Sequence, residues 1–239
     1  MKLTQHASAN CGARRGGALP DLVVLHYTAM SDAMAALGRL CDPQAEVSAH
    51  YLIARDGEVF QLVKEEKRAW HAGAGGWGAV RDVNSRSIGV ELDNTGTQPF
   101  PEPQMVALEQ LLAGILRRWS IPPERVIAHS DLAPARKSDP GTRFDWRRLA
   151  CAGLSVWPGL SSVACAPSSR ENGAEAADEY AFQVAAGRFG YPDTNTAAVL
   201  KVFRQRFRPW ATGPISTADV ATLSDLARRF PVDQLGQST

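Results

Sequence analysis

The segment Asp21-Leu-Val-Val-Leu-His-Tyr-Thr28 gives the clearest indication of the fold. It follows Pro20 and is a short apolar run that ends in polar residues, which is typical of a buried strand. The segments Ser87-Ile-Gly-Val-Glu-Leu-Asp93 and Val126-Ile-Ala-His129 predict two further strands on the same grounds. The chain is therefore expected to contain a sheet.

The remaining segments of the first 154 residues predict a mixture of helices and strands. Asp56-Gly57 lies inside the apolar stretch 49–63 and predicts the turn of a β-hairpin. Helices are predicted over 31–40 with Ser31 as N-cap, over 103–119 from the spacing of the apolar residues, and from 145 to 149. The predicted fold class is α/β, with a mixed central β-sheet flanked by helices.

A second domain is expected after a change in composition. Residues 155–177 are rich in Ser, Pro, Gly, Ala and Glu, which predicts a linker. Three short helical patterns follow over 180–190, 197–207 and 217–230. Residues 178–235 are thus predicted to form a small three-helix domain, which at about 60 residues can fold alone.

The composition is that of an ordinary globular protein. Hydrophobic residues make up 44% and charged residues 21% of the 239 residues, so a sizeable core can form. The formal net charge of +1 gives no bulk attraction to nucleic acid or to an anionic membrane, and neither partner is expected.

The N-terminal residues and the cysteines bear on the compartment. No apolar run follows Lys2, as a secretory signal requires, so a cytoplasmic location is expected. Cys11, Cys41, Cys151 and Cys165 form no CxxC pair, which favours reduced structural thiols over a disulfide framework.

Three features can be combined into a catalytic centre: His26 at a strand end, Glu91 within an apolar strand, and the run from His129 to Asp139. A strand-end histidine is commonly only packed, and an aspartate before Pro-Gly commonly forms a turn. A carboxylate on a buried strand is costly without a partner, however. Two neutral imidazoles and one carboxylate are a suitable ligand set for catalytic zinc, whose bound water has a pKa of about 7.

Five stretches resemble, in order, the motifs of the N-acetylmuramoyl-L-alanine amidase type 2 family, in particular its AmpD/AmiD-like zinc amidases. They are Leu25-His26-Tyr27, Ser48-Ala-His-Tyr-Leu-Ile53, Ala69-Trp-His-Ala-Gly73, Ser87-Ile-Gly-Val-Glu-Leu92, and Ala128-His129 through Lys137-Ser-Asp139-Pro-Gly. The resemblance implies zinc ligands His26, His129 and Asp139. It implies Glu91 as the catalytic base and Lys137 as the group that stabilises the oxyanion.

The resemblance also implies the reaction. The chain is expected to hydrolyse the lactyl amide between N-acetylmuramic acid, in its 1,6-anhydro form, and L-Ala of the stem peptide. Its partners are then peptidoglycan fragments or murein, and a monomer is favoured. The segment 198–209 resembles a helical peptidoglycan-binding module, with a merely supporting helical appendage as the alternative.

Four further residues are predicted to contact the substrate. His71 and Trp77 flank a glycine-rich stretch that borders the cleft in the family. Arg81 could meet carboxylates of the stem peptide, with a solvated surface arginine as the alternative. Asn94 could hydrogen-bond the peptide or, equally, stabilise a turn. His50 is expected to be structural.

Two other functions remain open at this point. A binding-only muropeptide receptor of the same fold would lack a ligand or the base, and an exported or phage-type lysin would act on the intact sacculus. An unrelated zinc peptidase is disfavoured because the sequence has no His-Glu-x-x-His run. A His-His-Asp site would also accept divalent ions other than zinc.

Overall fold

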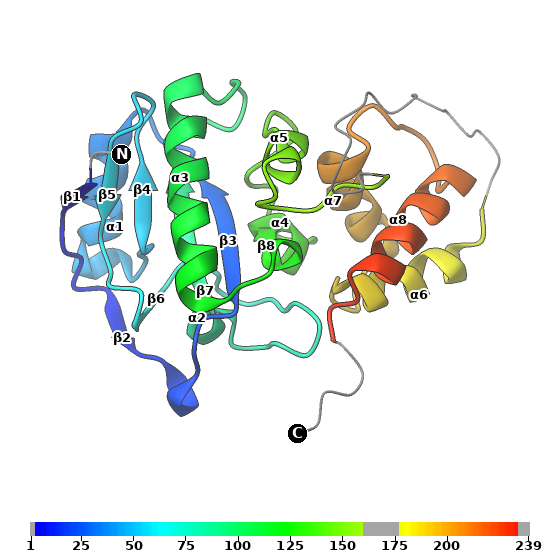
Figure 1. Ribbon diagram of the computed structural model, residues 1–239, viewed down its shortest axis with the longest axis horizontal. Helices are drawn as coiled ribbons and strands as arrows, with labels where there is room; N and C mark the ends of the chain where they lie inside the picture. Colours follow the sequence, from blue (N-terminus) through cyan, green and yellow to red (C-terminus); the bar gives the residue numbers. More distant parts are fainter. Residues whose placement is uncertain (1–2, 160–176, 234–239) are drawn as a thin grey trace.

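The computed structural model describes residues 3–159 and 177–233 and contains a six-stranded mixed sheet next to a group of three helices (Figure 1). The order of strands in the sheet is β1-β5-β4-β7-β3-β8, and β2 and β6 form a separate pair. The strands are β1 (Leu3–Gln5), β2 (Cys11–Ala13), β3 (Leu22–Tyr27), β4 (Tyr51–Ile53), β5 (Val59–Gln61), β6 (Lys67–Ala69), β7 (Ser87–Leu92) and β8 (Val126–Ala128). The predicted fold class is confirmed.

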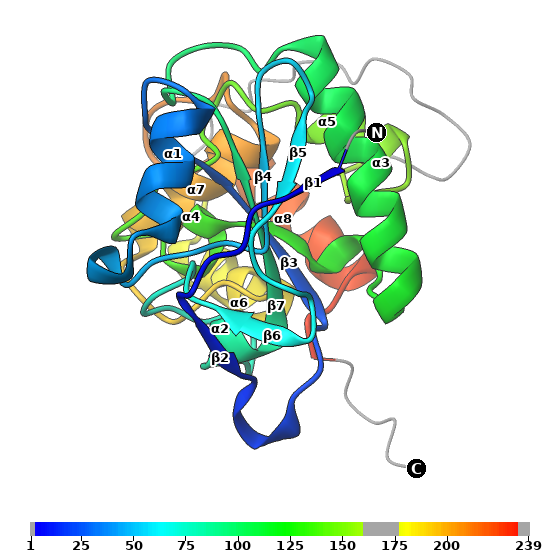
Figure 2. The ribbon, with the colours of Figure 1, turned by 90° about the vertical axis from the view of Figure 1, so that its left-hand side faces the viewer.

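Helices cover both faces of this sheet. The α-helices are α1 (Ala33–Cys41), α2 (Val83–Arg86), α3 (Glu102–Trp119), α4 (His129–Leu132), α5 (Trp146–Cys151), α6 (Glu179–Phe189), α7 (Thr196–Phe207) and α8 (Thr217–Arg229), and short 3-10 turns occur at Arg15–Gly17, Pro43–Ala45 and Pro123–Arg125. Figure 2 shows α1 and α3 on opposite sides of the strands. Among the described residues, no helix has both the length and the apolar character needed to cross a bilayer.

The alternation of side chains along the strands explains the two layers. Leu52 packs in one cluster with Leu37 and Leu40 of α1, whereas its neighbours Tyr51 and Ile53 belong to the larger core with α3. The Asp32 side chain, and not the predicted Ser31, caps α1 by accepting from the backbone N–H of Ala35. Asp32 directly precedes the first helical residue, which is the position that an N-cap requires.

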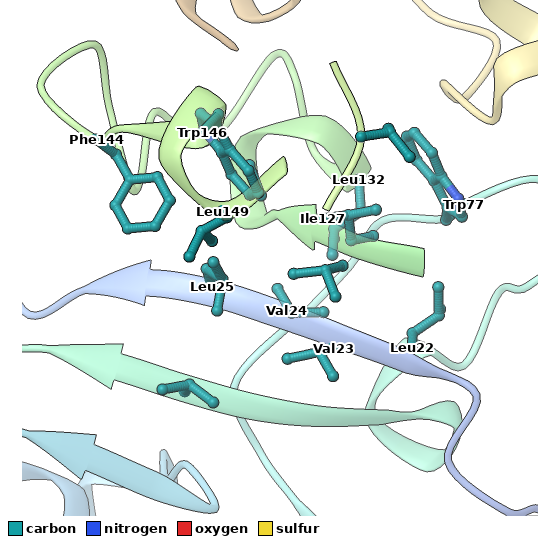
Figure 3. Close-up of a cluster of buried hydrophobic side chains, with 14 of the residues drawn as sticks. Leu22, Val23, Val24, Leu25, Trp77, Ile127, Leu132, Phe144, Trp146 and Leu149 are labelled. Carbon is teal, nitrogen blue, oxygen red and sulfur yellow. The ribbon is translucent and has the colours of Figure 1, made fainter. Parts of the chain in front are cut away.

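Strand β3 is central to the core, as its apolar run predicts. Residues 22 to 25 are fully buried, and β3 pairs in parallel with β7 on one side and β8 on the other. Figure 3 shows these side chains packed beside Ile127, Leu132, Trp146 and Leu149. Within the described part of the chain, β8 lies at the edge of the sheet and pairs with β3 alone.

The helices α6, α7 and α8 pack against the β8 side of the sheet (Figure 1). The Trp77 ring packs against Phe189 and Tyr191, whose ring centroids are 5.5 and 5.4 Å away. The first residues of the predicted linker take part in this packing, because Trp157 is buried and its ring lies 5.9 Å from that of Phe207. The predicted linker residues 160–176 and the last two residues of the predicted domain, 234 and 235, lie outside the described residues.

The cysteines differ in part from the prediction. Cys11 and Cys41 are free, but Cys151 is disulfide-bonded, so the expectation of reduced thiols is wrong at this position. Sequence spacing could not reveal this bond, because the connectivity of scattered cysteines cannot be deduced from the sequence alone.

The buried carboxylate of Glu65 links the hairpin region to the end of α3. Its oxygens accept from the Tyr51 hydroxyl at 2.7 Å, the Trp119 indole at 2.6 Å and the Arg118 guanidinium at 2.5 and 3.1 Å. Burial alone would raise the pKa of Glu65, but the hydrogen bonds from Arg118, Tyr51 and Trp119 outweigh it and lower the pKa. The ionised form is therefore the one that the fold stabilises.

Glu65 is expected to make stability depend on pH. A carboxyl whose pKa is lowered on folding stabilises the protein above its unfolded pKa of about 4.3, and this contribution is lost as the pH falls through the folded value. The free energy of unfolding of Glu65→Gln should thus be clearly below that of the original chain at pH 7, and the gap should narrow on acidification below about pH 4. Urea unfolding of both proteins at pH 7 and below about pH 4 measures the difference in their free energies of unfolding. A difference that does not change with pH would contradict the prediction.

Candidate metal centre and active-site cleft

Three predicted ligands meet at the carboxyl ends of adjacent parallel strands. His26 lies near the end of β3, and His129 directly follows β8, whose Ala128 pairs with Leu25. The two Nδ1 atoms are 2.9 Å apart, and each lies 3.0 Å from Oδ2 of Asp139. All three side chains are buried, with at most 8% of any of these residues exposed. The three ligand atoms thus face one point, the arrangement that a shared metal ion requires.

The hydrogen bond made by Nε2 of His129 fixes the tautomer of its ring. Its Nε2 lies 2.9 Å from the carbonyl oxygen of Ala72, which can only accept a hydrogen bond. Nε2 therefore carries the hydrogen, and the lone pair of Nδ1 faces Asp139 and His26.

A chain of hydrogen bonds fixes the tautomer of His26 in the same way. The Ser87 hydroxyl donates to the carbonyl of Val83 at 2.6 Å, so it accepts from Nε2 of His71 at 3.2 Å. Nδ1 of His71 is then an acceptor, and it takes the hydrogen of His26 Nε2 at 3.0 Å. The lone pair of His26 Nδ1 consequently faces the ligand cluster.

The protonation states suit a divalent metal. Burial, together with the nearby His129, lowers the pKa of His26 to about 4, and burial holds the pKa of His71 well below its usual range. Burial would raise the pKa of Asp139, but the adjoining imidazoles of His129 and His26 hold it below its ordinary value. Neutral imidazoles beside an ionised carboxylate are the forms that bind zinc, so these residues fit the ion that the sequence implied.

Glu91 lies beside this centre through strand register. It pairs with His26 across β3 and β7, and one of its carboxylate oxygens is buried without a hydrogen-bond partner in the described part of the chain. Burial, reinforced by Asp139 and opposed by Lys137, raises the pKa of Glu91 to about 8. An unpaired buried carboxylate is costly, and such groups are common at sites of proton transfer.

A cleft of about 460 Å³ opens over the cluster. Glu91 and the three ligands line it, and so does Lys137, as its position two residues before Asp139 suggests. Arg39, Trp70 and Arg136 also line the cleft and were not predicted as site residues. Arg39 lies on α1, where the sequence predicts the helix but not which sheet face the helix covers. Trp70 and Arg136 lie inside two of the five stretches that resemble the family, and this position could have identified them as site residues.

The structure assigns His71 a different environment from the predicted one. It borders the cleft, but both ring nitrogens are already engaged by His26 and Ser87, which leaves no polar atom for a substrate. Its ring packs so closely on β7 that a Cβ at Gly89 would lie 2.4 Å from it. His50 is structural, as expected: its Nδ1 accepts from the N–H of Gly89, and its Nε2 lies 3.1 Å from the Lys67 carbonyl.

The other predicted substrate contacts lie away from the cleft. Trp77 is 1% exposed because Phe189 and Tyr191 cover its ring. Asn94 is buried and stabilises its own turn, where its amide donates to the carbonyl of Gln98 and its oxygen accepts from the N–H of Gly96. Arg81 is exposed and lies outside the cleft lining formed by the described residues. A stacking role for Trp77 therefore conflicts with its burial, and Asn94 takes the turn role that its sequence position also allowed. A substrate contact by Arg81 stays a prediction.

Replacing His71 should separate its hydrogen-bond role from its bulk. His71→Leu removes the acceptor for His26 Nε2 and is expected to weaken zinc binding about 10- to 100-fold, the usual cost of losing such a partner. His71→Asn keeps an acceptor oxygen near the Nδ1 position and should retain more of the affinity. Chelator competition measures both constants, and equal affinity in the two variants would count against the tautomer role.

Comparisons with known proteins bear on this geometry. Residues 16–142 match the family model described as N-acetylmuramoyl-L-alanine amidase. The chain is 37% identical over 210 residues to the N-acetylmuramoyl-L-alanine amidase AmiD of Escherichia coli, covering 79% of this chain and 75% of that protein. It is 41% identical over 106 residues to the 1,6-anhydro-N-acetylmuramyl-L-alanine amidase AmpD of Haemophilus influenzae, covering 44% and 58%.

A solved structure agrees with these matches. The complex of the E. coli amidase AmiD with the substrate anhydro-N-acetylmuramic acid-L-Ala-D-γ-Glu-L-Lys superimposes with a TM-score of 0.78 at 33% sequence identity. The match covers 90% of this chain and 91% of that one, so it includes helices beyond the sheet domain. On the family match and this overall likeness, the chain belongs to the N-acetylmuramoyl-L-alanine amidase type 2 family.

Proposed function

We propose that this amidase uses zinc held by His26, His129 and Asp139 to cleave the lactyl amide of soluble 1,6-anhydro-muramyl peptides. The observation that carries the proposal is the convergence of the three ligand atoms beside Glu91, one of whose carboxylate oxygens is buried without a hydrogen-bond partner within the described residues. Three protein ligands leave one coordination position open, which is the arrangement of a catalytic zinc site rather than a structural one. Zinc bound there would supply a Lewis acid and lower the pKa of its water to about 7.

The side chains around the centre suit amide hydrolysis. Glu91 takes a proton from the attacking water, whose oxygen forms the new bond to the carbonyl carbon. As the carbon–nitrogen bond breaks, Glu91 returns this proton to the departing amine of L-Ala. Lys137, in the cleft wall, donates a hydrogen bond to the carbonyl oxygen while negative charge develops on it.

The cleft also suits the rest of the muropeptide. A γ-linked glutamate, as in the substrate bound to the E. coli amidase AmiD, keeps a free α-carboxylate. Arg39 lines the cleft and is exposed, so its guanidinium is available to such a carboxylate. Arg136 is less available, because it already donates to the carbonyl oxygens of Ala72 and Ala74.

The place of the reaction follows from the substrate. A soluble anhydro-muramyl peptide is a product of wall breakdown, so its hydrolysis belongs to peptidoglycan recycling or turnover. The disulfide at Cys151 favours an oxidising compartment and argues against the cytoplasmic location that the sequence suggested.

Product analysis by mass spectrometry tests the proposal. Purified protein is given anhydro-muramyl tripeptide and intact sacculi in parallel, with and without a chelator. We expect release of free peptide from the soluble substrate, loss of this release in chelator, and its recovery on adding zinc. Release from sacculi alone would assign the enzyme to the intact wall, and undiminished activity in chelator would exclude the metal.

A further inference from the structure

A buried arginine of the helical domain, formed by α6, α7 and α8, reaches the turn between β8 and α4 that carries His129. Arg206 of α7 is 2% exposed, and its guanidinium pairs with Asp131 of α4. It also donates to the backbone carbonyl of Val126 at 3.0 Å and to the Ser155 hydroxyl at 3.2 Å. Its carbon Cζ lies 4.1 Å from the centroid of the Trp146 ring. The Arg206 side chain of the helical domain thus contacts both sides of the β8–α4 turn at the edge of the sheet.

Asp131 connects Arg206 to the backbone of the turn and to Tyr191. One of its carboxylate oxygens accepts from the N–H of Ala128 at 2.9 Å as well as from Arg206. The other oxygen accepts from the Tyr191 hydroxyl at 3.1 Å, and Tyr191 follows α6. Because Ala128 immediately precedes His129, the carboxylate sets the direction in which the chain leaves β8.

The turn has little support of its own. The helix α4 has only four residues, too few to be stable in isolation, and β8 is an edge strand of three residues. The position of His129 Nδ1 relative to His26 and Asp139 depends on this turn, since Ser130 also donates its N–H to the carbonyl of Asp139 at 3.0 Å. Contacts that hold the turn therefore hold two of the three ligands.

We propose that Arg206 and Tyr191 are positioning residues of the metal centre, so that the helical domain is part of the zinc site rather than a separate module beside it. The proposal rests on the metal ion of the proposed function. Because coupling between sites is reciprocal, bound zinc in turn stabilises the docking of the helical domain.

The test uses the full chain and the variants Arg206→Met, Arg206→Lys and Tyr191→Phe. Zinc dissociation constants come from chelator competition, and melting temperatures come from circular dichroism. We expect the zinc dissociation constant to rise at least tenfold in Arg206→Met and a few-fold in Tyr191→Phe, which removes a single hydroxyl. Arg206→Lys keeps the charge but loses the fork of donors, so it should fall between Arg206→Met and the original chain.

Arg204 provides a matched control on the same helix. It is also buried, and it pairs with Asp219 at 2.5 Å and donates to the carbonyls of Gly213 and Pro214, all within the helical domain. Arg204→Met should lower the melting temperature while leaving the zinc dissociation constant within about twofold of the original. Unchanged zinc affinity in Tyr191→Phe and in folded Arg206→Met or Arg206→Lys would overturn the proposal and leave a docking role only.

Hydrogen exchange on the metal-free protein separates this idea from the proposed function. If the turn is held by these contacts, the amides of 126–132 should exchange faster in Tyr191→Phe and Arg206→Lys than in the original chain. This result is expected even if the protein binds no zinc. In that case the proposed zinc site would be rejected, while the role of Arg206 and Tyr191 in positioning the turn would be supported. Unaltered exchange over 126–132 would overturn the positioning role whether or not zinc binds.

Discussion

Glu91→Gln is expected to lower kcat by about 10³-fold, within the range that general acid–base catalysis contributes. The substitution keeps the size of the side chain but removes its capacity to take a proton from water. Glu91 is not one of the three clustered ligands, so the zinc dissociation constant should stay within a few-fold of the original. Steady-state hydrolysis of anhydro-muramyl tripeptide and zinc titration together measure both effects.

A matched control guards against a general effect of charge loss. Glu66 is exposed and lies outside the cleft lining formed by the described residues, so Glu66→Gln should leave kcat unchanged. If Glu91→Gln lost its zinc, the residue would be acting on the metal rather than on the proton. If it kept full activity, another group would have to be the base.

The sequence was sufficient to predict the centre of the sheet and the residues at its end. The apolar run of β3 is buried on both faces, so its pattern is strong and places His26 where the strand ends. Glu91 could be identified as a candidate functional residue because burying a carboxylate among apolar strand residues is costly unless it has a partner. The parallel register that sets His26 beside Glu91, however, depends on pairing between distant segments, which period-2 patterns do not specify.

The predicted substrate contact of Trp77 conflicts with the way its loop packs against other parts of the chain. Trp77 follows a glycine-rich stretch that predicts an exposed rim, but the ring is covered by residues more than a hundred positions later. No local pattern contains this information, because burial of a loop residue is decided by tertiary packing. The short strands β1 and β6 were missed for a related reason: three residues give too little alternation to detect.

Asp139→Asn is expected to weaken zinc binding by about 10³-fold. If three ligands share a binding free energy of about 12 kcal/mol, loss of one removes about 4 kcal/mol, which corresponds to this factor. The amide keeps the shape of the side chain but not the charge that lies 3.0 Å from both imidazoles. Hydrolysis at limiting zinc should fall in parallel, because the reaction needs the loaded centre.

Thermal unfolding gives a readout of Asp139→Asn that does not depend on activity. Zinc that binds only the folded state raises the melting temperature of the original chain, and the rise grows with zinc concentration over the dissociation constant. This rise should nearly vanish in Asp139→Asn at the same zinc concentration. Asp145→Asn is the control, since Asp145 is an exposed cap of α5 and should leave the zinc response intact. A full zinc response in Asp139→Asn would mean that the ion binds elsewhere, and the assignment of His26, His129 and Asp139 as its ligands would have to be abandoned.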